Sequence, residues 1–143
     1  MKFTTREMME KDAEAVNTLS KQLGYPLSIE QTLQNIKAIL QSKDHTAFVA
    51  EYEHKIVGWI GAAHAIMIEV MPHCEMNGLV IDEHHRGMGI GKLLIDKVKQ
   101  WAREKNNSKI GLRCNVKRTE AHLFYQHLGF TEIKQQKNFV ISI

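Results

Sequence analysis

The chain of 143 residues is poor in cysteine and proline, with two of each, and it has no long apolar run. Cys74 and Cys114 lack the close pairing of a zinc ribbon, and two cysteines in a cytosolic chain are usually reduced thiols. No segment reaches the roughly 20 apolar residues of a membrane-spanning helix. The N-terminus has no signal-peptide core. We therefore expect a cytoplasmic protein without a disulfide framework.

The net charge is also small, at +3. This excess is too weak to indicate a nucleic-acid partner, but it is compatible with an anionic small molecule. Hydrophobic residues make up 43% of the chain and charged residues 24%, which are ordinary globular values. The chain shows no internal repeat and no flexible linker, so we predict one domain over residues 1–143.

Hydrophobic periodicity predicts elements in the order β-α-α-β-β-β-α-β-α-β-β. Strands are predicted at residues 3–8, 46–52, 56–68, 75–81, 109–114, 130–133 and 138–143, the last two as a hairpin. Helices are predicted at residues 10–23, 89–105 and 119–128. A further helix is predicted to follow a capping box of Ser28 and Gln31. We expect an α+β fold, a twisted mixed sheet of six to seven strands flanked by about four helices.

The most informative segment joins the strand that ends at Ile81 to the helix that begins near residue 89. After Arg86, three glycines alternate at positions 87, 89 and 91. Glycine leaves the backbone N–H groups accessible, and the first turn of a helix adds unpaired donors and a positive dipole end. This combination suits a phosphate or pyrophosphate. Arg86 and Leu93 break the Walker A pattern, and the glycine spacing does not fit a dinucleotide fingerprint.

The run Arg86-Gly87-Met88-Gly89-Ile90-Gly91 resembles the Arg/Gln-x-x-Gly-x-Gly/Ala signature of the GNAT superfamily of N-acetyltransferases. A second run, Ala121 to Tyr125 followed by Gly129-Phe130, is similar to the later motif of that family. The two motifs stand in the family's order, and the match is strong over residues 75–131. The stretch from Asn115 to His122 most resembles the branch that contains aminoalkylphosphonate acetyltransferases and some aminoglycoside acetyltransferases.

The resemblance implies a GNAT-like fold, acetyl-CoA as co-substrate and no metal. The backbone of a bulged strand would bind the pantetheine arm, through Leu79, Val80 and Ile81. The Val80 amide would polarise the thioester carbonyl. The residues implied for the pyrophosphate are Arg86, Gly87, Met88, Gly89, Ile90 and Gly91, with Lys92 adding charge. Many relatives have asparagine where this chain has Arg118, and Asn115 is the expected substitute.

The resemblance also implies that Tyr125 donates a proton to the departing CoA thiolate, although a tyrosine on an amphipathic helix is more often a packing residue. An acceptor amine is mostly protonated at neutral pH, so a base is required. We favour Glu75, because alternation would put Glu75, Asn77 and Leu79 on one face of the strand. A solvated carboxylate is the structural alternative. The rival bases on the adjoining turn are Glu69 and His73.

The leading hypothesis is an enzyme that transfers an acetyl group to a primary amine of a small molecule, by direct attack in a ternary complex. The alternatives are a protein or peptide N-acetyltransferase and a non-catalytic acetyl-CoA-binding regulatory domain. No nucleic-acid or membrane partner is expected. Dimers are common among similar proteins, and an open strand edge at Phe139 to Ile143 would support a homodimer. A metal held by His64, His73 and Cys74 is a minor alternative to the metal-free prediction.

Overall fold

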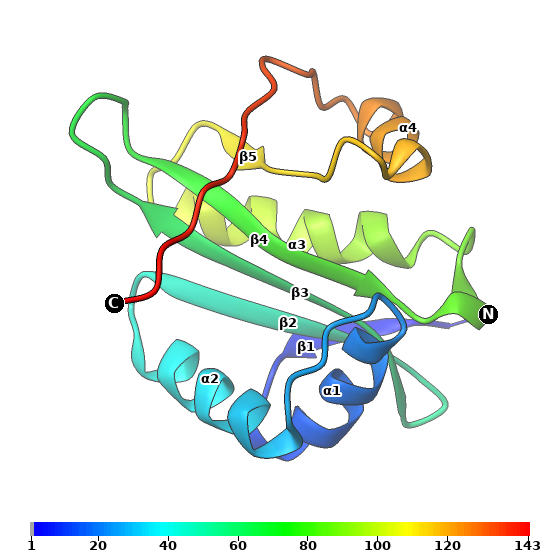
Figure 1. Cartoon of the computed structure of the whole chain (residues 1–143). Coiled ribbons are helices and arrows are strands. Elements are labelled where there is room, and N and C mark those ends of the chain that lie inside the picture. The colour runs from blue at the N-terminus through cyan, green and yellow to red at the C-terminus, as the bar shows by residue number, and fades with distance from the viewer. Residues whose placement is uncertain (1) are drawn as a thin grey trace. The chain divides into compact units, whose positions relative to one another are not determined.

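The computed structural model describes residues 2–143. The chain divides into two compact units, one ending at Leu112 and one spanning Arg113–Ile143, and each is described by itself (Figure 1). The prediction of one domain over residues 1–143 stays a prediction. Among the described residues, no helix combines the length and apolar character needed to cross a bilayer.

The first unit is built on one mixed sheet of five strands in the order β1-β2-β3-β4-β5. The strands are β1 (Thr4–Glu7), β2 (His45–Tyr52), β3 (Lys55–Ala65), β4 (His73–Ile81) and β5 (Ile110–Leu112). Neighbours from β1 to β4 pair antiparallel, and β5 alone runs parallel to β4. The α+β class and the mixed sheet are confirmed, whereas the expected count of six to seven strands is wrong.

Four α-helices are present in residues 2–143, as predicted. They are α1 (Ala13–Lys21), α2 (Ile29–Gln41), α3 (Ile90–Glu104) and, in the second unit, α4 (Thr119–His127). Two short 3-10 helices, η1 (Glu10–Asp12) and η2 (Glu83–His85), precede α1 and α3. The predicted cap of α2 forms, since the Ser28 hydroxyl accepts a hydrogen bond of 3.0 Å from the Gln31 amide.

The helices of the first unit cover both faces of the sheet (Figure 1). On one face, α1 and α2 bury an apolar cluster against β2, including Val16, Ile36 and Val49. On the other face, α3 lies so close to Gly58 that a Cβ atom there would be 3.3 Å from Ile90 and from Leu94. The apolar stripe of each helix therefore has a strand surface to cover, which is the layered arrangement of an α+β domain.

The two predicted C-terminal strands do not form. Residues 130–143 contain no helix or strand, and their hairpin, at 130–133 and 138–143, is a wrong prediction. A strand is stable only when a neighbour accepts and donates its backbone hydrogen bonds. In the described chain, the one backbone hydrogen bond of this segment is that of Phe130 to Tyr125, which closes the end of α4.

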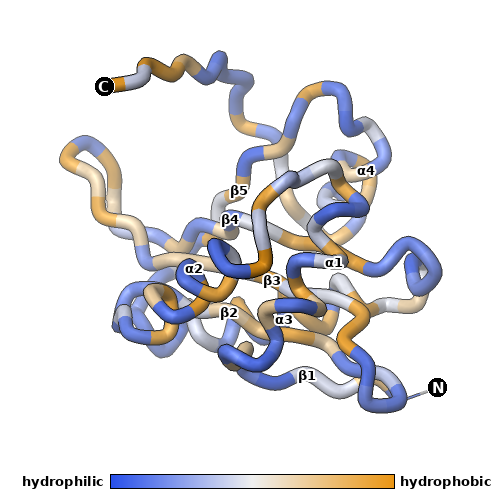
Figure 2. Tube along the Cα trace, turned by 60° about the horizontal axis from the view of Figure 1, so that its bottom comes forward, coloured by the Kyte–Doolittle hydropathy of each residue, from blue (hydrophilic) through white to orange (hydrophobic). Residues whose placement is uncertain are grey.

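Strand β3 also stops at Ala65, short of the predicted residue 68. The loop to β4 exposes five large apolar side chains, and parts of it are orange in Figure 2. These residues are Ile66, Met67, Ile68, Val70 and Met71. This segment is as apolar as a strand, but it has no partner strand among the described residues.

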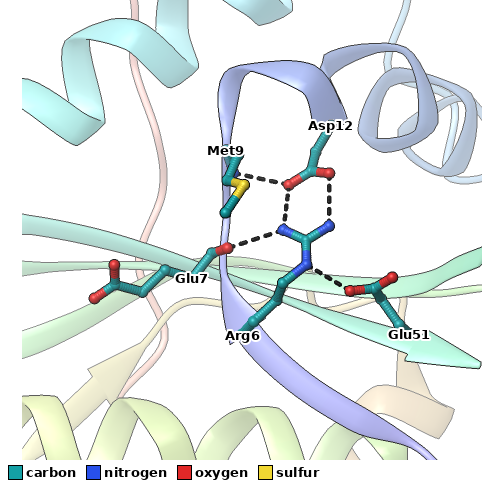
Figure 3. A network of polar contacts seen from close by, with 5 residues as sticks. All are labelled: Arg6, Glu7, Met9, Asp12 and Glu51. Atoms are coloured by element: carbon teal, nitrogen blue, oxygen red, sulfur yellow. Dashed lines mark hydrogen bonds and ion pairs between the residues drawn. The ribbon is translucent and has the colours of Figure 1, made fainter. Parts of the chain in front are cut away.

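The entry to α1 is held by a network centred on Arg6 of β1 (Figure 3). Its two terminal nitrogens donate to both carboxylate oxygens of Asp12, at 2.8 and 2.9 Å, and its Nε donates to Glu51 of β2. Asp12 is only 3% exposed and also accepts from the Met9 amide. Burial alone would raise the pKa of Asp12, but the bonds from Arg6 and Met9 outweigh it and lower the pKa.

Substitution Asp12→Asn should lower the free energy of unfolding by about 2–4 kcal/mol at neutral pH, because it removes the buried carboxylate that accepts two of the hydrogen bonds of Arg6 and leaves only Glu51 as an anionic partner. A carboxyl with a lowered pKa stabilises the fold above its unfolded pKa, and this stabilisation is lost as pH falls through the folded pKa. Urea unfolding at pH 7 and near pH 3 measures both effects. The difference in the free energy of unfolding between wild type and Asp12→Asn should be smaller at low pH than at pH 7. Substitution of the exposed Glu14 by glutamine should change the free energy of unfolding little at either pH. An equal loss for both substitutions would contradict the role of the network.

Candidate active site

The edge of β4 is only partly covered by β5. The three residues of β5 pair with Cys74, Glu75 and Met76, and no strand of the described chain pairs with Asn77–Ile81 on that side. Half of the backbone N–H and C=O groups in this stretch therefore face away from β3 and have no neighbouring strand to form hydrogen bonds with. An extended, amide-containing molecule could add to this edge as a strand does.

Alternation along the ladder identifies the open groups. The Asp82 amide donates to the Val57 carbonyl of β3, at 2.8 Å. Because N–H directions alternate along an antiparallel strand, the Val80 amide also points to β3, and those of Leu79 and Ile81 point to the free edge. The predicted use of the Val80 amide to polarise a carbonyl is therefore wrong, and Leu79 and Ile81 are the donors the strand offers.

A bulge in β4 changes the direction of the side chains. The pairing with β3 shifts between Gly61 and Ala62, so that Asn77 has no partner of its own. Glu75 pairs with Ala63 and Leu79 pairs with Ile60, which are three residues apart and so lie on opposite faces of the sheet. The expectation that Glu75 and Leu79 share one face is therefore wrong, because the extra residue reverses the alternation.

The loop after β4 has the backbone of an anion site. Gly87 and Gly89 have φ angles of 77° and 83°, and Gly89 stands directly before α3 with no side chain capping the helix. The chain from Arg86 to Gly89 is exposed, whereas Ile90 is buried. The first-turn amides of α3 have no acceptor within their own helix, and they add to its positive dipole end. The loop is therefore suited to hold a phosphate.

Two cations lie near this loop. A shallow hollow of about 580 Å³ is lined by Met88, Gly89 and Leu93 together with Lys2 and Phe3 of the N-terminus. Lys92 is exposed, and its ammonium group lies 3.0 Å from the Asp96 carboxylate one turn along α3. The pairing with Asp96 reduces the positive charge that Lys92 offers to a ligand. The position of Lys2 beside the glycine loop was not predicted from the sequence.

The loop is anchored to the end of α1 by Gln22. The side-chain amide of Gln22 donates to Asp82 at 3.0 Å, and its carbonyl accepts from the Glu83 amide at 3.0 Å. The other oxygen of Asp82 lies 2.6 Å from Nδ1 of His85. Burial raises the pKa of Asp82, but its hydrogen bonds to Gln22 and His85 more than offset this and lower the pKa. Sequence reasoning missed Gln22, because a contact across 60 residues leaves no local pattern.

Glu75 lies beside His73 on the same face of β4. The two side chains are joined by a contact of 2.7 Å between Nε2 and Oε1, and they are 18% and 22% exposed. Nδ1 of His73 faces the Met71 carbonyl at 3.0 Å, so both ring nitrogens face acceptors, an arrangement that favours the doubly protonated ring. The bond to Glu75 and that to Met71 raise the pKa of His73. Gly111 of β5 leaves room for the pair, since a Cβ there would lie 3.2 Å from Glu75.

The second unit contains Tyr125 on α4. Its ring packs edge-on against Phe124 and Phe130, with centroids 5.2 and 5.7 Å apart. Burial is the main cause of the raised pKa of Tyr125, and Cys114 adds to it. The positive charge of Arg118 lowers the pKa by less than these two effects raise it. The phenol therefore stays protonated across the neutral range and can act as a proton donor.

The two residues predicted to assist the cofactor site have local roles in the second unit. The side-chain oxygen of Asn115 accepts from the Lys117 amide at 2.9 Å, and its backbone carbonyl accepts from the Arg118 amide at 3.0 Å. Asn115 thus builds the turn that leads into α4. Arg118 is the exposed residue before that helix. Their contact with a cofactor stays a prediction.

The histidines considered for a metal have other partners. His64 lies 2.9 Å from the side-chain oxygen of Asn107, His73 pairs with Glu75, and Cys74 is fully buried. Within residues 2–143, no three His, Cys, Asp or Glu side chains gather as a metal site would require.

The chain is similar to known proteins in its sequence and in its fold. A model of the acetyltransferase (GNAT) family matches residues 12–130. The uncharacterized N-acetyltransferase YhdJ of Bacillus subtilis is 31% identical over 123 residues, which is 85% of this chain and 86% of the relative. Human N-acetyltransferase 8 is 31% identical over 100 residues, 69% of this chain but 44% of that protein. The chain thus spans less than half the length of the human relative.

The fold has a solved counterpart. The aminoglycoside N-acetyltransferase AAC(6')-Iy, solved in complex with CoA, superposes with a TM-score of 0.89 at 22% identity, covering 99% of this chain and 96% of that one. The family match covers most of the chain, including the glycine loop and α4. The chain therefore belongs to the GNAT family and is an N-acetyltransferase.

Proposed function

We propose that this enzyme transfers the acetyl group of acetyl-CoA to a primary amine of a small molecule. One observation carries the proposal: the open edge of β4 runs directly into a glycine loop whose positive-φ residues precede a helix. A long substrate with an amide-containing arm and a pyrophosphate matches both parts. The CoA complex of the structural neighbour supports the choice of acetyl-CoA.

In this proposal the backbone of Leu79 and Ile81 binds the pantetheine arm, and one of the two amides polarises the thioester carbonyl. The amides between Arg86 and Lys92 hold the pyrophosphate. The open space at Gly87 and Gly89 supports this assignment, because no atom of the described chain lies within 4 Å of the Cβ position of either residue. Asn115 and Arg118 remain proposed as accessory cofactor contacts.

Glu75 is our proposed base. Its Oε1 is paired with His73, so the second oxygen is the one available to an amine or to a bridging water. The His73 imidazolium fixes the carboxylate, and this pair is complete below about pH 6.5 and weakens as pH rises through the raised pKa of His73. Tyr125 is the proposed acid that protonates the CoA thiolate.

The amine attacks the thioester carbon, the C–S bond breaks, and the products are an N-acetyl amine and CoA. A protonated amine first loses one proton to Glu75 and then attacks as the neutral amine. As the C–S bond breaks, the nitrogen loses its second proton to solvent and the thiolate gains one from Tyr125, and both side chains regain their starting protonation by exchange with solvent. Holding both substrates together removes most of the entropic cost of their encounter. We propose a cytoplasmic homodimer as the working form.

Substitution Glu75→Gln should lower kcat/KM by about tenfold to a hundredfold at pH 7. The deficit should shrink as pH approaches the pKa of the amine, because the substrate then arrives neutral and needs no base. Rates measured from pH 6.5 to 10 test this. Exposed Glu69→Gln, the rival base, serves as the matched control. A deficit independent of pH would assign Glu75 a purely structural role.

The acceptor class is tested by thiol release from acetyl-CoA with five kinds of amine: aminoalkylphosphonates, amino acids, polyamines, aminoglycosides and a lysine peptide. We expect a small amine to give the highest kcat/KM. A clear preference for the lysine peptide would replace the small-molecule proposal with protein acetylation.

A further inference from the structure

The start of the glycine loop is held by a residue that lies outside the glycine motif. Asp82 and η2, which lead into the loop, are attached to Gln22, the residue that follows α1. Gln22 uses both ends of its side-chain amide. Its nitrogen donates to Oδ1 of Asp82 and its oxygen accepts from the Glu83 amide, each at 3.0 Å. One side chain therefore fixes both a carboxylate and a backbone group at the entry to the loop.

His85 forms a second attachment at the same place. Its Nδ1 lies 2.6 Å from Oδ2 of Asp82, and its ring contacts that of Tyr52 at the end of β2, with centroids 6.0 Å apart. Asp82 thus directs one carboxylate oxygen to Gln22 and the other to His85. The entry to the loop is therefore connected to α1 and to β2, two elements distant from it in sequence.

These attachments matter because the glycines themselves do little to fix the loop. Gly87 and Gly89 adopt positive φ angles, and no atom of the described chain lies within 4 Å of their Cβ positions. Glycine also loses more conformational freedom than any other residue when one conformation is fixed. A ligand that needs one loop conformation binds more weakly in proportion to the time that the loop spends in others. Contacts that fix residues 82–85 therefore favour binding at the loop.

We infer that Gln22 is a positioning residue for acetyl-CoA, which holds the entry of the glycine loop in the conformation that binds the pyrophosphate. Gln22 acts through Asp82 and the Glu83 amide, without contacting the ligand itself. Only the identity of the ligand is taken from the proposed function. The anchor itself follows from contacts within the first unit.

Calorimetric titration of acetyl-CoA into Gln22→Ala tests this role. The substitution removes both hydrogen bonds of the side chain, and the dissociation constant should rise about three- to tenfold. The matched control is Gln34→Ala, which shortens an exposed glutamine of α2. This control should bind acetyl-CoA as the wild type does. Equal affinities of Gln22→Ala and the wild type would overturn the inference.

Substitution Gln22→Glu separates the hydrogen bonds from the space that the side chain fills. The ionised carboxyl cannot donate to Asp82, and it places a like charge beside it. At pH 7.5 the dissociation constant should therefore rise at least as much as in Gln22→Ala. At pH 5 the introduced carboxyl takes up a proton, since Asp82 opposes its ionisation, and it can donate again. The excess over the wild type should then fall to about threefold or less.

Each variant is compared with the wild type at the same pH, because Glu83, His84 and His85 titrate at this place in all the proteins. The ratio for Gln22→Ala should be the same at both pH values. A ratio for Gln22→Glu that does not change with pH would mean that the side chain only fills space, and the inference would fail.

Hydrogen exchange of the ligand-free protein tests the anchor without acetyl-CoA. The Glu83 amide donates to Gln22, and the His85 amide donates to the Asp82 carbonyl. Both amides should exchange about fivefold faster or more in Gln22→Ala than in the wild type, and Gln34→Ala should match the wild type. Unchanged exchange in Gln22→Ala would refute the anchor. Failure of the wild type to bind acetyl-CoA would instead refute the proposed function.

Discussion

Replacing Tyr125 by phenylalanine should lower kcat by about a hundredfold and leave the affinity for acetyl-CoA within a factor of about two. The ring contacts with Phe124 and Phe130 need only the aromatic face, so the variant keeps the packing of α4. What it loses is a phenol whose pKa is raised by burial and which therefore carries its proton at neutral pH. Steady-state rates and calorimetric titration of acetyl-CoA measure the two effects separately.

The matched control is Tyr52→Phe, which also removes one hydroxyl. The Tyr52 ring contacts Phe3 and His85, and both contacts survive the substitution. Its turnover should stay near that of the wild type. If Tyr125→Phe were as active as Tyr52→Phe, Tyr125 would be a packing residue and the thiolate would leave without it.

Gly89→Val should raise the dissociation constant for acetyl-CoA by about thirtyfold or more. Gly89 has a φ of 83°, a conformation that costs an L-residue roughly 1–2 kcal/mol and a β-branched residue more. The first turn of α3 would shift to relieve this strain, and its amides would no longer converge on the pyrophosphate. Each 1.4 kcal/mol lost at that site is a factor of ten in affinity.

Gly24→Val separates strain from binding. Gly24 has a φ of 85° and, like Gly89, nothing lies within 4 Å of its Cβ position, but it follows α1 and is outside the loop. Both substitutions should lower thermal stability to a similar degree. Only Gly89→Val should weaken acetyl-CoA binding, and equal weakening by both would contradict the phosphate-cradle assignment.

The local patterns predicted most of the first unit. Ser28 and Gln31 marked the start of α2, and alternating glycines marked the start of α3, because caps and positive φ angles are properties of a few neighbouring residues. The order of the central elements follows from hydrophobic periodicity. These signals need no knowledge of distant contacts.

Three features escaped prediction because they depend on pairing. The resemblance implied a bulged strand, but the position of the bulge at Asn77 is defined only relative to β3, and it decides that Leu79 and Ile81, rather than Val80, present their amides at the open edge. The bond between Gln22 and Asp82 joins residues far apart in sequence. The apolar alternation of residues 139–143 suggested a strand within the chain, but a pattern identifies a strand former without identifying its partner.

Amine-dependent acetyl transfer is best tested by measuring thiol release from acetyl-CoA with and without an amine, using protein shown by calorimetry to bind acetyl-CoA. We expect release that saturates with amine, produces one N-acetyl amine for each CoA, and falls about a hundredfold in Tyr125→Phe. Tight acetyl-CoA binding with no amine-dependent release from any of the five amine classes would contradict it, and would favour a regulatory domain that senses acetyl-CoA.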